Sequence, residues 1–562
     1  MQPVISASQM REIDRRSTSD YQIPSILLMQ AAAEACLQAI STHFSGSIAG
    51  KKAQILCGPG NNGGDGAALA HELSRAGAHA DVVLFGMVDQ TRGDARTNFE
   101  IDRKLSEFEA GSNDCAAPLS FVECQTSSSW EQLAQPRRTF DIIVDALFGT
   151  GLSRPLDGLL VQVVQHLTLV RTARERSSAI RPFIVSIDIP SGLNADSAQI
   201  VGEAVHADLT VTFTAPKPAN VLPPASHLNG ELVIANIGSP AQLIESVKST
   251  LFLTDEAEVR DWLVNTRYSP GSFKNSHGHV LVVAGSRDYT GAAVLCGDGA
   301  MRSGAGMVTV ATAASVQPSI AARLMPEVIT TALAETDRGA ISEKAIDHVL
   351  QLASKVSVVA IGPGLSADDE RTRQFVISLL RRRKVPTVVD ADALNCVAAS
   401  DPSGWPKDLL GSDDAPLILT PHPGEMLRLL GTTDKGALND RVEVARQFAT
   451  KHKLILVLKG ERSFVAAPDG RVFANPTGNA GLGTAGAGDT LTGLIAGFIA
   501  QAVGAVNPKA DVLSSTIAAL YVGGLAGDLA ARHLGMRTMV ASDIRDHFSE
   551  AVRLLDPEGE KP

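Results

Sequence analysis

The stretch AQILCGPGNNGGDGAALAHEL, residues 53–73, decides the fold of the first half of the chain. An apolar run, Ala53–Cys57, is followed by a glycine-rich turn, and a helical pattern starts at Ala67. This order predicts a strand, a turn and a helix, which is the first step of a βα unit. Glycines in such a turn let a phosphate approach the backbone, and the helix start offers free amide donors.

The turn at residues 58–66 contains the pattern GxGxxG, which also occurs in NAD-dependent dehydrogenases. A dehydrogenase of that type needs an acidic residue at the end of its second strand. In this chain Asp81 lies at the start of the next apolar run. Asn61, Asn62 and Asp65 would have no part in that kind of site, so the sequence argues against a dehydrogenase.

More apolar runs, each ending in Gly, Pro, Asn or Asp, extend the βα pattern. Residues 8–44 have helical spacing with a break at Pro24, and the less regular stretch 238–254 separates two βα series. We therefore predict two three-layer α/β/α domains, a Rossmann-like domain at residues 1–245 and a second one at 246–562. The expected strands are Ala80–Phe85, Ile142–Asp145, Phe183–Ile187, His279–Ala284, Met307–Ala311, Val356–Ile361, Thr387–Asp390, Leu417–Thr420, Leu454–Leu458 and Ser463–Ala467.

Composition narrows the class of protein. A formal net charge of −11 and an aromatic content of 4% disfavour binding to nucleic acid. The six cysteines show no CxxC spacing, which is typical of reduced thiols. The start of the chain has no basic segment before an apolar one, and the uncharged stretch after Asp489 is diluted by glycine and polar residues. We expect a cytoplasmic protein that binds neither nucleic acid nor a membrane.

Two more strand ends meet the glycine turn at one edge of the predicted sheet. They are followed by DALFGTGLSRP, residues 145–155, and DIPSGLN, residues 188–194. Side-chain oxygens of Asn62, Asp145 and Ser191 could hold a hard cation there. Asp188 could exchange a proton with a bound ligand. In the alternative interpretation, Asp145 and Asp188 merely cap loops.

The motifs GPGNNGGDG, VDALFGTGL and DIPSGLNAD resemble the epimerase domain of NAD(P)HX repair enzymes, over residues 8–240. The resemblance implies that the domain interconverts the R and S forms of hydrated NADH and NADPH, with Asp188 as the catalytic group. It also implies a potassium ion held by Asn62, Asp145 and Ser191. The implied substrate contacts are Asn61, Asn62, Gly63, Gly64, Asp65, Gly149, Thr150, Gly151, Leu152, Ser153, Arg154, Pro155 and Asp188.

The second half has its own glycine-rich motif, NPTGN at residues 475–479 followed by GLGTAGAGDTLTG at 481–493. A glycine turn that runs into an uncharged helix makes an anion site from backbone amides, with Asp489 beside it. A carboxylate there can take the proton of a substrate hydroxyl while the amides hold a phosphoryl group. No GxxxxGK[ST] pattern occurs, so this is not a P-loop protein.

This arrangement resembles ribokinase-like small-molecule kinases and, more closely, the nucleotide-dependent NAD(P)HX dehydratase, over residues 268–530. The closer resemblance rests on SFKNSHGH (272–279), AGS (284–286), GAGMV (304–308), GPGL (362–365), DADALN (390–395) and TPHPGE (420–425). It implies a ribokinase-like fold, with Asp489 as the catalytic group. Implied substrate contacts are Ala292, Gly364, His422 and Asp489; implied nucleotide contacts are Lys459, Gly460, Glu461, Arg462, Ser463 and Gly488.

One departure concerns Ala487, which stands where relatives often have a hydroxyl residue, so only its amide can contact phosphate. Asp390, Asp392 and Glu425 could position Mg²⁺ with the nucleotide, or they could cap loops. The resulting hypothesis is a bifunctional enzyme, expected to be a homo-oligomer, that repairs NADHX and NADPHX with ADP or ATP as phosphoryl donor. Its alternative is a kinase for a small alcohol fused to a non-catalytic Rossmann-like binding or scaffold domain.

Overall fold

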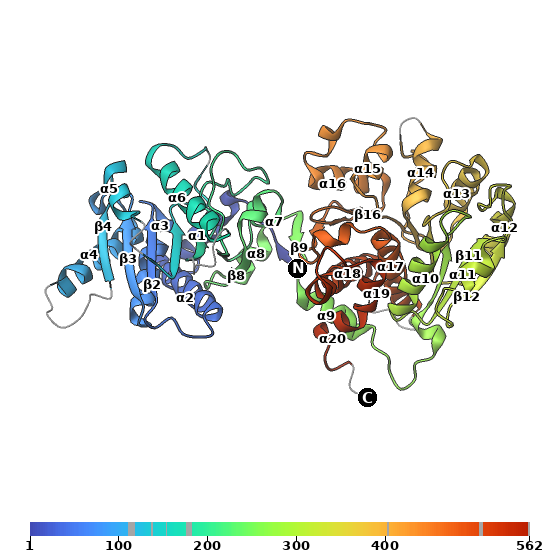
Figure 1. The fold of residues 1–562 in the computed structure, drawn as a ribbon, viewed down its shortest axis with the longest axis horizontal. Coiled ribbons are helices and arrows are strands. Elements are labelled where there is room, and N and C mark those ends of the chain that lie inside the picture. The colour runs from blue at the N-terminus through green and yellow to red at the C-terminus, as the bar shows by residue number, and fades with distance from the viewer. Residues whose placement is uncertain are drawn as a thin grey trace. The chain divides into compact units, whose positions relative to one another are not determined.

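The computed structural model describes residues 1–110, 119–135, 139–152, 154–175, 182–401, 404–504 and 510–559. The chain divides into two compact units, one of Gln2–Ser249 and the other of Thr250–Pro562 with Met1 (Figure 1). The sequence-based boundary at residue 245 falls inside the short helix α8 (Ala241–Ser246), which belongs to the first unit.

The first unit is built on a parallel sheet of seven strands in the order β4-β3-β2-β5-β6-β7-β8. Its strand order reverses between β2 and β5, so the loops after these two strands diverge and leave room for a ligand. The strands are β2 (Lys52–Cys57), β3 (His79–Leu84), β4 (Leu119–Glu123), β5 (Ile142–Ala146), β6 (Phe183–Ile187), β7 (Leu209–Phe213) and β8 (Glu231–Ala235).

Both faces of this sheet are buried. In β2, Ile55 and Cys57 pack into one apolar cluster with helices α2 and α3, whereas Leu56 packs into another cluster with helix α6. Because successive strand residues point to opposite faces, one helical layer covers each side. The helices are α1 (Ala7–Ser19), α2 (Ser25–His43), α3 (Asn61–Arg75), α4 (Gly93–Ala110), α5 (Ser127–Leu133), α6 (Gly158–Glu175), α7 (Pro218–Val221) and α8.

Helix α3 begins at Asn61, six residues before the start expected from the sequence at Ala67. Three glycines of the predicted turn, Gly63, Gly64 and Gly66, are therefore inside the helix, whereas Gly58 and Gly60 precede it. A side chain on Gly63 would place its Cβ 1.8 Å from the carbonyl oxygen of Gly58, and one on Gly66 would place it 2.6 Å from the Cβ of Ala146. These glycines let the helix pack closely against neighbouring backbone and strand, at some cost in helix propensity.

The second unit is built on a sheet in which β9-β18-β17-β16-β15-β14-β13-β10-β11-β12 are neighbours in this order. Strands β10 to β16 pair in parallel, while β16, β17 and β18 pair as antiparallel hairpins. The strands are β9 (Leu251–Leu253), β10 (His279–Val283), β11 (Met307–Ala313), β12 (Ile329–Leu333), β13 (Val358–Ile361), β14 (Thr387–Val389), β15 (Leu417–Leu419), β16 (Ile455–Leu458), β17 (Phe464–Ala466) and β18 (Val472–Ala474).

Every residue of β13, β14, β15 and β16 is buried, so helices cover both faces here too (Figure 1). Both units are thus three-layer α/β/α assemblies, as the sequence predicts. The helices are α9 (Glu256–Asn265), α10 (Thr290–Arg302), α11 (Gln317–Ala321), α12 (Ile346–Ala353), α13 (Glu370–Arg382), α14 (Ala391–Ser400), α15 (Pro423–Leu429), α16 (Arg441–His452), α17 (Ala487–Gly504), α18 (Val512–Leu534), α19 (Ala541–Asp546) and α20 (Phe548–Leu555).

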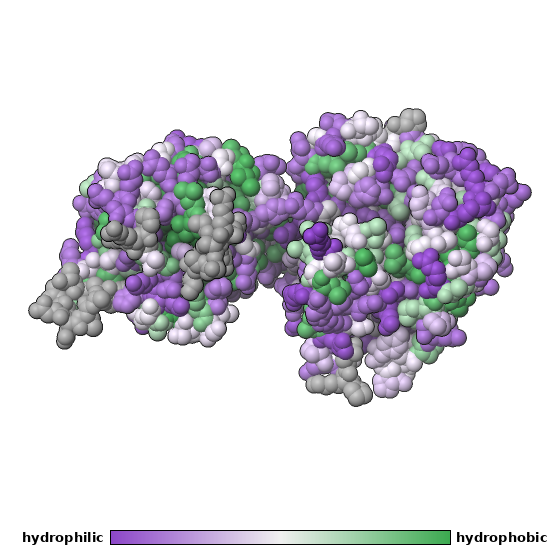
Figure 2. Space-filling model, in the orientation of Figure 1, coloured by the Kyte–Doolittle hydropathy of each residue, from purple (hydrophilic) through white to green (hydrophobic). Residues whose placement is uncertain are grey.

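Apolar residues gather in the interior, and the face shown in Figure 2 mixes hydrophilic and hydrophobic residues. Within the described residues, α18 is the one helix long and apolar enough to cross a membrane, but 72% of its apolar window is buried in the protein. It packs against α17, α20 and α9, as a core helix does. The described cysteines, Cys36, Cys57, Cys124, Cys296 and Cys396, are all buried and unpaired.

Candidate active sites

The first site lies at the carboxyl edge of the parallel sheet in the first unit, where β2, β5 and β6 end. Asp188 directly follows β6 and has a left-handed backbone, with a φ of 66°. A non-glycine residue rarely adopts this conformation, and when it does it is often at a functional site. The strained backbone at Asp188 singles out this strand end.

Asp188 is paired with a lysine that the sequence did not single out. Lys217 is completely buried, and its Nζ donates to Oδ1 of Asp188 at 2.5 Å. The same Nζ donates to Oγ1 of Thr212 at 2.9 Å and to the carbonyl oxygen of Phe213 at 3.1 Å. All three of its hydrogens are therefore used, and they hold Oδ1 of Asp188 in one position.

The second oxygen of Asp188 faces two other residues implied by the resemblance. A Cβ added to Gly149 would lie 3.2 Å from Oδ2 of Asp188 and 2.9 Å from Oδ1 of Asn62. Gly149 therefore leaves an open space between these two polar groups. Nδ2 of Asn62 is buried without a hydrogen-bond partner, so the amide has bonding capacity for a ligand.

Two more carboxyl groups influence this site. Burial raises the pKa of Asp65, and the charges of Asp188 and Asp14 raise it further. Burial also raises the pKa of Asp14 to about 6, with Lys217 acting in the opposite direction. Oδ1 of Asp14 is buried without a hydrogen-bond partner. Asp14, on α1, is a site residue that the sequence analysis missed.

Asp145 and Ser191, two of the expected potassium ligands, are linked to each other. The backbone N–H of Ser191 donates to Oδ2 of Asp145 at 2.8 Å, as does Oγ of Ser186. Oδ1 of Asp145 accepts a longer bond of 3.3 Å from the N–H of Leu147, which leaves room for a cation on that oxygen. Burial raises the pKa of Asp145, and its hydrogen bonds to Ser191, Ser186 and Leu147 oppose this shift.

The remaining expected residues of the first site lie around this centre. Asn61 is exposed in the first turn of α3, and Gly63 and Gly64 are buried behind it. Thr150 and Leu152 are half-buried, while Gly151, Arg154 and Pro155 are exposed. Ser153 lies outside the described residues.

The second site lies where α17 begins, beside the ends of β14, β15 and β16. Asp489 is the third residue of α17. Burial raises its pKa to about 7, the charges of Asp390 and Asp392 add to the rise, and Lys459 opposes it. Burial and the charges of Asp489 and Asp390 also raise the pKa of the Cys296 thiol, on α10. Asp489 can therefore both accept and release a proton near neutral pH.

Lys459 connects the expected nucleotide contacts to the carboxylates. Its Nζ donates to Oδ1 of Asp390 at 2.8 Å, and Oγ1 of Thr492 donates to Oδ2 at 2.7 Å. A Cβ on Gly488 would lie 3.2 Å from Nζ of Lys459, so this lysine lies directly against the start of α17. An ammonium group at a helix start is suited to bind phosphate.

His422 caps helix α15 through its Nδ1, which accepts from the N–H groups of Gly424 at 3.0 Å and Glu425 at 3.4 Å. Glu425 returns the contact, since its Oε2 accepts from the backbone N–H of His422 at 2.9 Å. Burial, and then the charges of Lys459 and Arg428, lower the pKa of His422. The other ring nitrogen, Nε2, lies 3.5 Å from Oε1 of Glu425.

Glu425 belongs to the same electrostatic group as Asp489. Burial raises its pKa to about 7, Lys459 opposes the rise and Asp390 adds to it. Asp392 is used differently, because its Oδ2 accepts the backbone N–H of Ser366 at 2.9 Å and so holds a loop.

Ala292 and Gly364, two of the expected substrate contacts, lie close together. Gly364 has a φ of 64°, and a Cβ there would lie 2.6 Å from the Cβ of Tyr289 and 3.1 Å from that of Ala292. Only glycine fits this position. The contact lies beside β10 and β13, where the strand order of the second sheet reverses, so it borders the place where α/β proteins bind ligands.

Lys459 to Ser463 form the turn between β16 and β17. Arg441 supports this turn by donating to the carbonyl oxygens of Leu458 at 3.4 Å and Lys459 at 3.1 Å. Gly460 lies directly against the Arg441 guanidinium, and both Gly460 and Glu461 are exposed. Burial lowers the pKa of Arg462, which faces inward and donates to the carbonyl oxygen of Asn475.

Two family models match the chain. One, for the YjeF-related protein N-terminus, matches residues 25–219, and one for NAD(P)H-hydrate dehydratase matches residues 280–549. The bifunctional NAD(P)H-hydrate repair enzyme Nnr of Moorella thermoacetica is 40% identical, over 99% of this chain and 98% of that protein. The enzyme of the same name from Thermofilum pendens is 34% identical, over 98% of this chain and 96% of that protein.

A solved structure also matches the second unit. It is the ADP/ATP-dependent NAD(P)H-hydrate dehydratase of Bacillus subtilis, co-crystallised with ATP and Mg²⁺. The match has 30% sequence identity and a TM-score of 0.44, and it covers 54% of this chain and 99% of that one.

Proposed function

The chain belongs to the bifunctional NAD(P)H-hydrate repair enzymes, and we propose from this premise how its two sites divide the repair. The first unit epimerises the R and S forms of hydrated NAD(P)H, and the second dehydrates the S form to NAD(P)H. Each reaction takes place at a cluster of carboxyl groups around one lysine. The position of Asp489 in the first turn of α17, next to Gly488 and the Lys459 ammonium group, is the single observation that carries the assignment of the second site.

In the dehydration, the ring hydroxyl must become a better leaving group. Asp489 takes the hydroxyl proton while the hydroxyl oxygen forms a bond to the terminal phosphorus of the nucleotide, whose bridging P–O bond breaks. The ring then loses phosphate from one carbon and a proton from the next, which restores the double bond. A base with a pKa of about 7 suits the first step at neutral pH.

The nucleotide phosphates would lie between Lys459 and the amides at the start of α17, with the turn from Gly460 to Ser463 beside them. Mg²⁺ would enter with the phosphates and keep several water ligands, as this ion usually does. Asp390 accepts from Lys459 and Thr492, and Asp392 holds the Ser366 loop, so both carboxylates already have partners within the protein. Asp390 already has its charge balanced by Lys459, so we assign the ion mainly to the phosphates.

In the epimerisation, one group must remove a proton from the hydrate and return it. We assign this to Asp188, whose Oδ1 is held by Lys217 while Oδ2 faces the space beside Gly149 and Asn62. The resemblance-implied contacts from Asn61 to Asp65 and from Gly149 to Pro155 would surround the substrate. A potassium ion would be held by Asn62, Asp145 and Ser191, consistent with the bonding capacity left on Oδ1 of Asp145.

A cytoplasmic location, a homo-oligomeric state and the absence of nucleic-acid and membrane partners remain predictions from the sequence. The charge of −11 disfavours binding to nucleic acid, and the burial of α18 fits a core helix rather than a membrane span.

The test is a product analysis with the full-length protein and a mixture of both hydrate epimers. With ADP or ATP, both epimers should disappear and NADH absorbance should return; without nucleotide, the epimers should only interconvert. Asp489→Asn should stop the return of NADH and leave the interconversion intact. A stable phosphorylated alcohol in place of NADH would instead identify a kinase. Loss of the S form alone, with no epimer exchange, would identify the first unit as a binding scaffold.

A further inference from the structure

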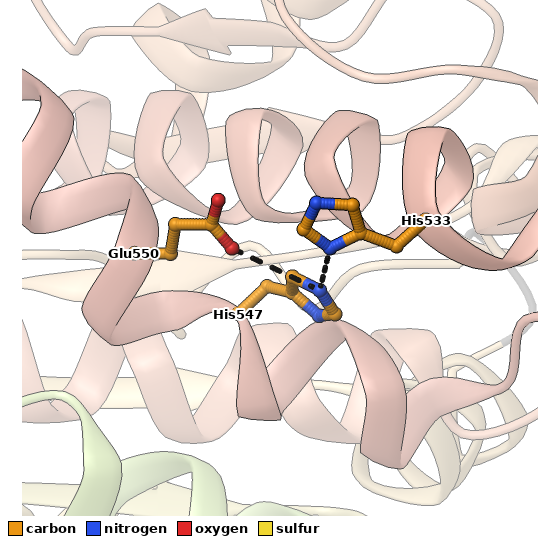
Figure 3. Close-up of side chains that lie close together, drawn as sticks. All are labelled: His533, His547 and Glu550. Carbon is orange, nitrogen blue, oxygen red and sulfur yellow. Dashed lines mark hydrogen bonds and ion pairs between the residues drawn. The ribbon is translucent and has the colours of Figure 1, made fainter.

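Three metal-ligating side chains meet at the end of α18, outside the candidate active sites. His533 is in the last turn of α18, His547 lies between α19 and α20, and Glu550 is in the first turn of α20 (Figure 3). Their ligand atoms all lie within 4.8 Å of one another. Nδ1 of His533 is 2.9 Å from Nε2 of His547, which is 3.9 Å from Oε2 of Glu550.

The tautomer of His547 is fixed by the backbone. Its Nδ1 lies 2.7 Å from the carbonyl oxygen of Asp543, which can only accept, so Nδ1 carries the proton. Nε2 of neutral His547 is then a lone-pair donor that faces His533 and Glu550. Histidine ligands of metals are usually held in this way, with one ring nitrogen bonded to a carbonyl and the other free to coordinate.

We infer that His533, His547 and Glu550 form a binding site for one divalent transition-metal ion of the zinc class. Two imidazole nitrogens and one carboxylate oxygen are a common zinc ligand set, with water in the fourth position. In a tetrahedral site with bonds of about 2.0–2.1 Å, ligand atoms are separated by roughly 3.3 Å. The two histidine nitrogens are 2.9 Å apart, which is slightly less than this value, and Nε2 of His547 is 3.9 Å from Oε2 of Glu550, which is slightly more. Small side-chain rotations would therefore complete the site.

Metal binding would change the position of one proton, which is on His533. Without a metal, Nδ1–H of His533 donates to Nε2 of His547. With a metal, both nitrogens give their lone pairs to the ion, and the proton of His533 moves through solvent to its own Nε2. This exchange of tautomer neither adds a proton to the two rings nor removes one.

The exposure of the cluster fits an open fourth position. His533 is exposed, and the side chains of His547 and Glu550 are 17% and 35% exposed. The nearby cation Arg545 is already paired with Asp298 at 3.0 Å and with Asp546 at 2.8 Å, so it does not compete with a metal ion for Glu550.

The site would close a loop that supports the second active site. The connection between His533 and His547 contains Met539 and Ala541. A Cβ on Gly481 would lie 2.9 Å from Cε of Met539, and one on Gly486 would lie 3.2 Å from Cβ of Ala541. Both glycines belong to the segment that leads into Asp489. A bound ion would therefore link His533 to His547, and the connection between these two residues packs against the segment that precedes Asp489.

The experiment measures metal binding directly on the full-length protein, freed of any affinity tag. Equilibrium dialysis against Zn²⁺ gives the stoichiometry, and Co²⁺ added in place of Zn²⁺ gives visible absorption bands that report four-coordination by nitrogen and oxygen. We expect the wild type to bind one more equivalent of Zn²⁺ than the His533→Gln/His547→Gln double variant. Each single variant, and Glu550→Gln, should weaken binding at that site by at least about tenfold.

His348→Gln is the matched control, because His348 is an exposed histidine on another helix, α12. It should leave the stoichiometry and the Co²⁺ bands unchanged. Melting temperatures without metal should be alike in all variants, which separates loss of the site from misfolding. Equal Zn²⁺ binding by wild type and double variant, or an equal loss in His348→Gln, would overturn the inference.

Discussion

The two candidate active sites share a design and differ in one pairing. Each places a lysine among several carboxyl groups where parallel strands end. In the first site Lys217 contacts Asp188, the expected acid/base group. In the second, Lys459 contacts Asp390, and Asp489 is left with a raised pKa of about 7. In the first unit the lysine is paired with the expected catalytic group itself. In the second unit the lysine is paired with a neighbouring carboxylate, and it acts on Asp489 only through its charge.

This difference indicates two ways to prepare a carboxylate for proton transfer. A carboxylate bonded to an ammonium group is positioned and stabilised as an anion. A carboxylate that is buried among other carboxylates holds its proton more tightly and is a stronger base once ionised. Four changes test this difference between the sites, in order of decreasing expected effect.

The first change exchanges each proposed catalytic carboxylate for its amide. Asp188→Asn should slow epimer exchange by about 10²–10⁴-fold and leave dehydration of the S form intact, because a carboxamide does not transfer protons. Asp489→Asn should do the reverse. Both rates can be followed on one protein sample, by chromatography of the epimers and by NADH absorbance. A loss of both reactions in either variant would mean that the two sites are not independent.

The second change removes each lysine. Lys217→Met leaves the Asp188 carboxylate buried without its partner and should destabilise the first unit by about 3–5 kcal/mol. Lys459→Met should destabilise the second unit by a smaller amount, because the Lys459 side chain is 18% exposed whereas that of Lys217 is 1% exposed. Its main effect should be a higher KM for the nucleotide. Calorimetric unfolding of both variants provides the comparison, and equal losses of stability would contradict it.

The third change compares the two glycine-rich segments. Gly63→Ala would press a methyl group against the carbonyl of Gly58, 1.8 Å away, and should destabilise the first unit by about 1–3 kcal/mol. Gly483→Ala, in the second unit, has no atom within 4 Å of the new Cβ and should leave stability unchanged. Gly60→Ala, equally open, is the control within the first segment. Thermal unfolding of the three variants tests whether the space around the added Cβ determines the loss of stability.

The fourth change is in pH. Because Asp489 must be ionised to accept a proton, kcat/KM for dehydration should fall about tenfold per unit as the pH drops below its pKa of about 7, and level off above it. Glu425 also has a pKa of about 7, so Glu425→Gln is the control. The break in the profile should persist in this variant. Its disappearance would assign the break to Glu425.

Most strands could be predicted from the sequence because they are buried on both faces and contain uninterrupted apolar runs. One missed strand, β7, is buried throughout, with threonines alternating with apolar residues, and other missed strands lie at sheet edges or are short. Ile329–Leu333, the edge strand β12, contains two threonines and is largely exposed on one side. Val472–Ala474 has only three residues. Such segments carry too little periodic signal to be distinguished from loops.

The start of α3 was misplaced for a different reason. Glycine has low helix propensity, so GNNGGDG predicts a turn. Close packing against Gly58 and Ala146 explains these glycines, and that packing depends on contacts with another strand. These contacts cannot be predicted from the residues of the turn alone.

Among the site residues, Asp188 and Asp489 could be predicted from the sequence because each is part of a recognisable motif. Lys217 and Asp14 were not. Lys217 lies between two prolines, Pro216 and Pro218, and a lysine in a loop is usually exposed. Its burial depends on β6 and β7 ending side by side, with Asp188 and Phe213 offering it oxygens.

The buried cysteines have a chemical consequence. Peroxides and alkylating agents react with thiolates, and burial raises the thiol pKa of all five described cysteines, to about 12 in Cys396. Cys296 lies near Asp489, whose negative charge further suppresses its ionisation. Chemistry at the second site should therefore persist in an oxidising solution that inactivates enzymes with exposed, acidic thiols.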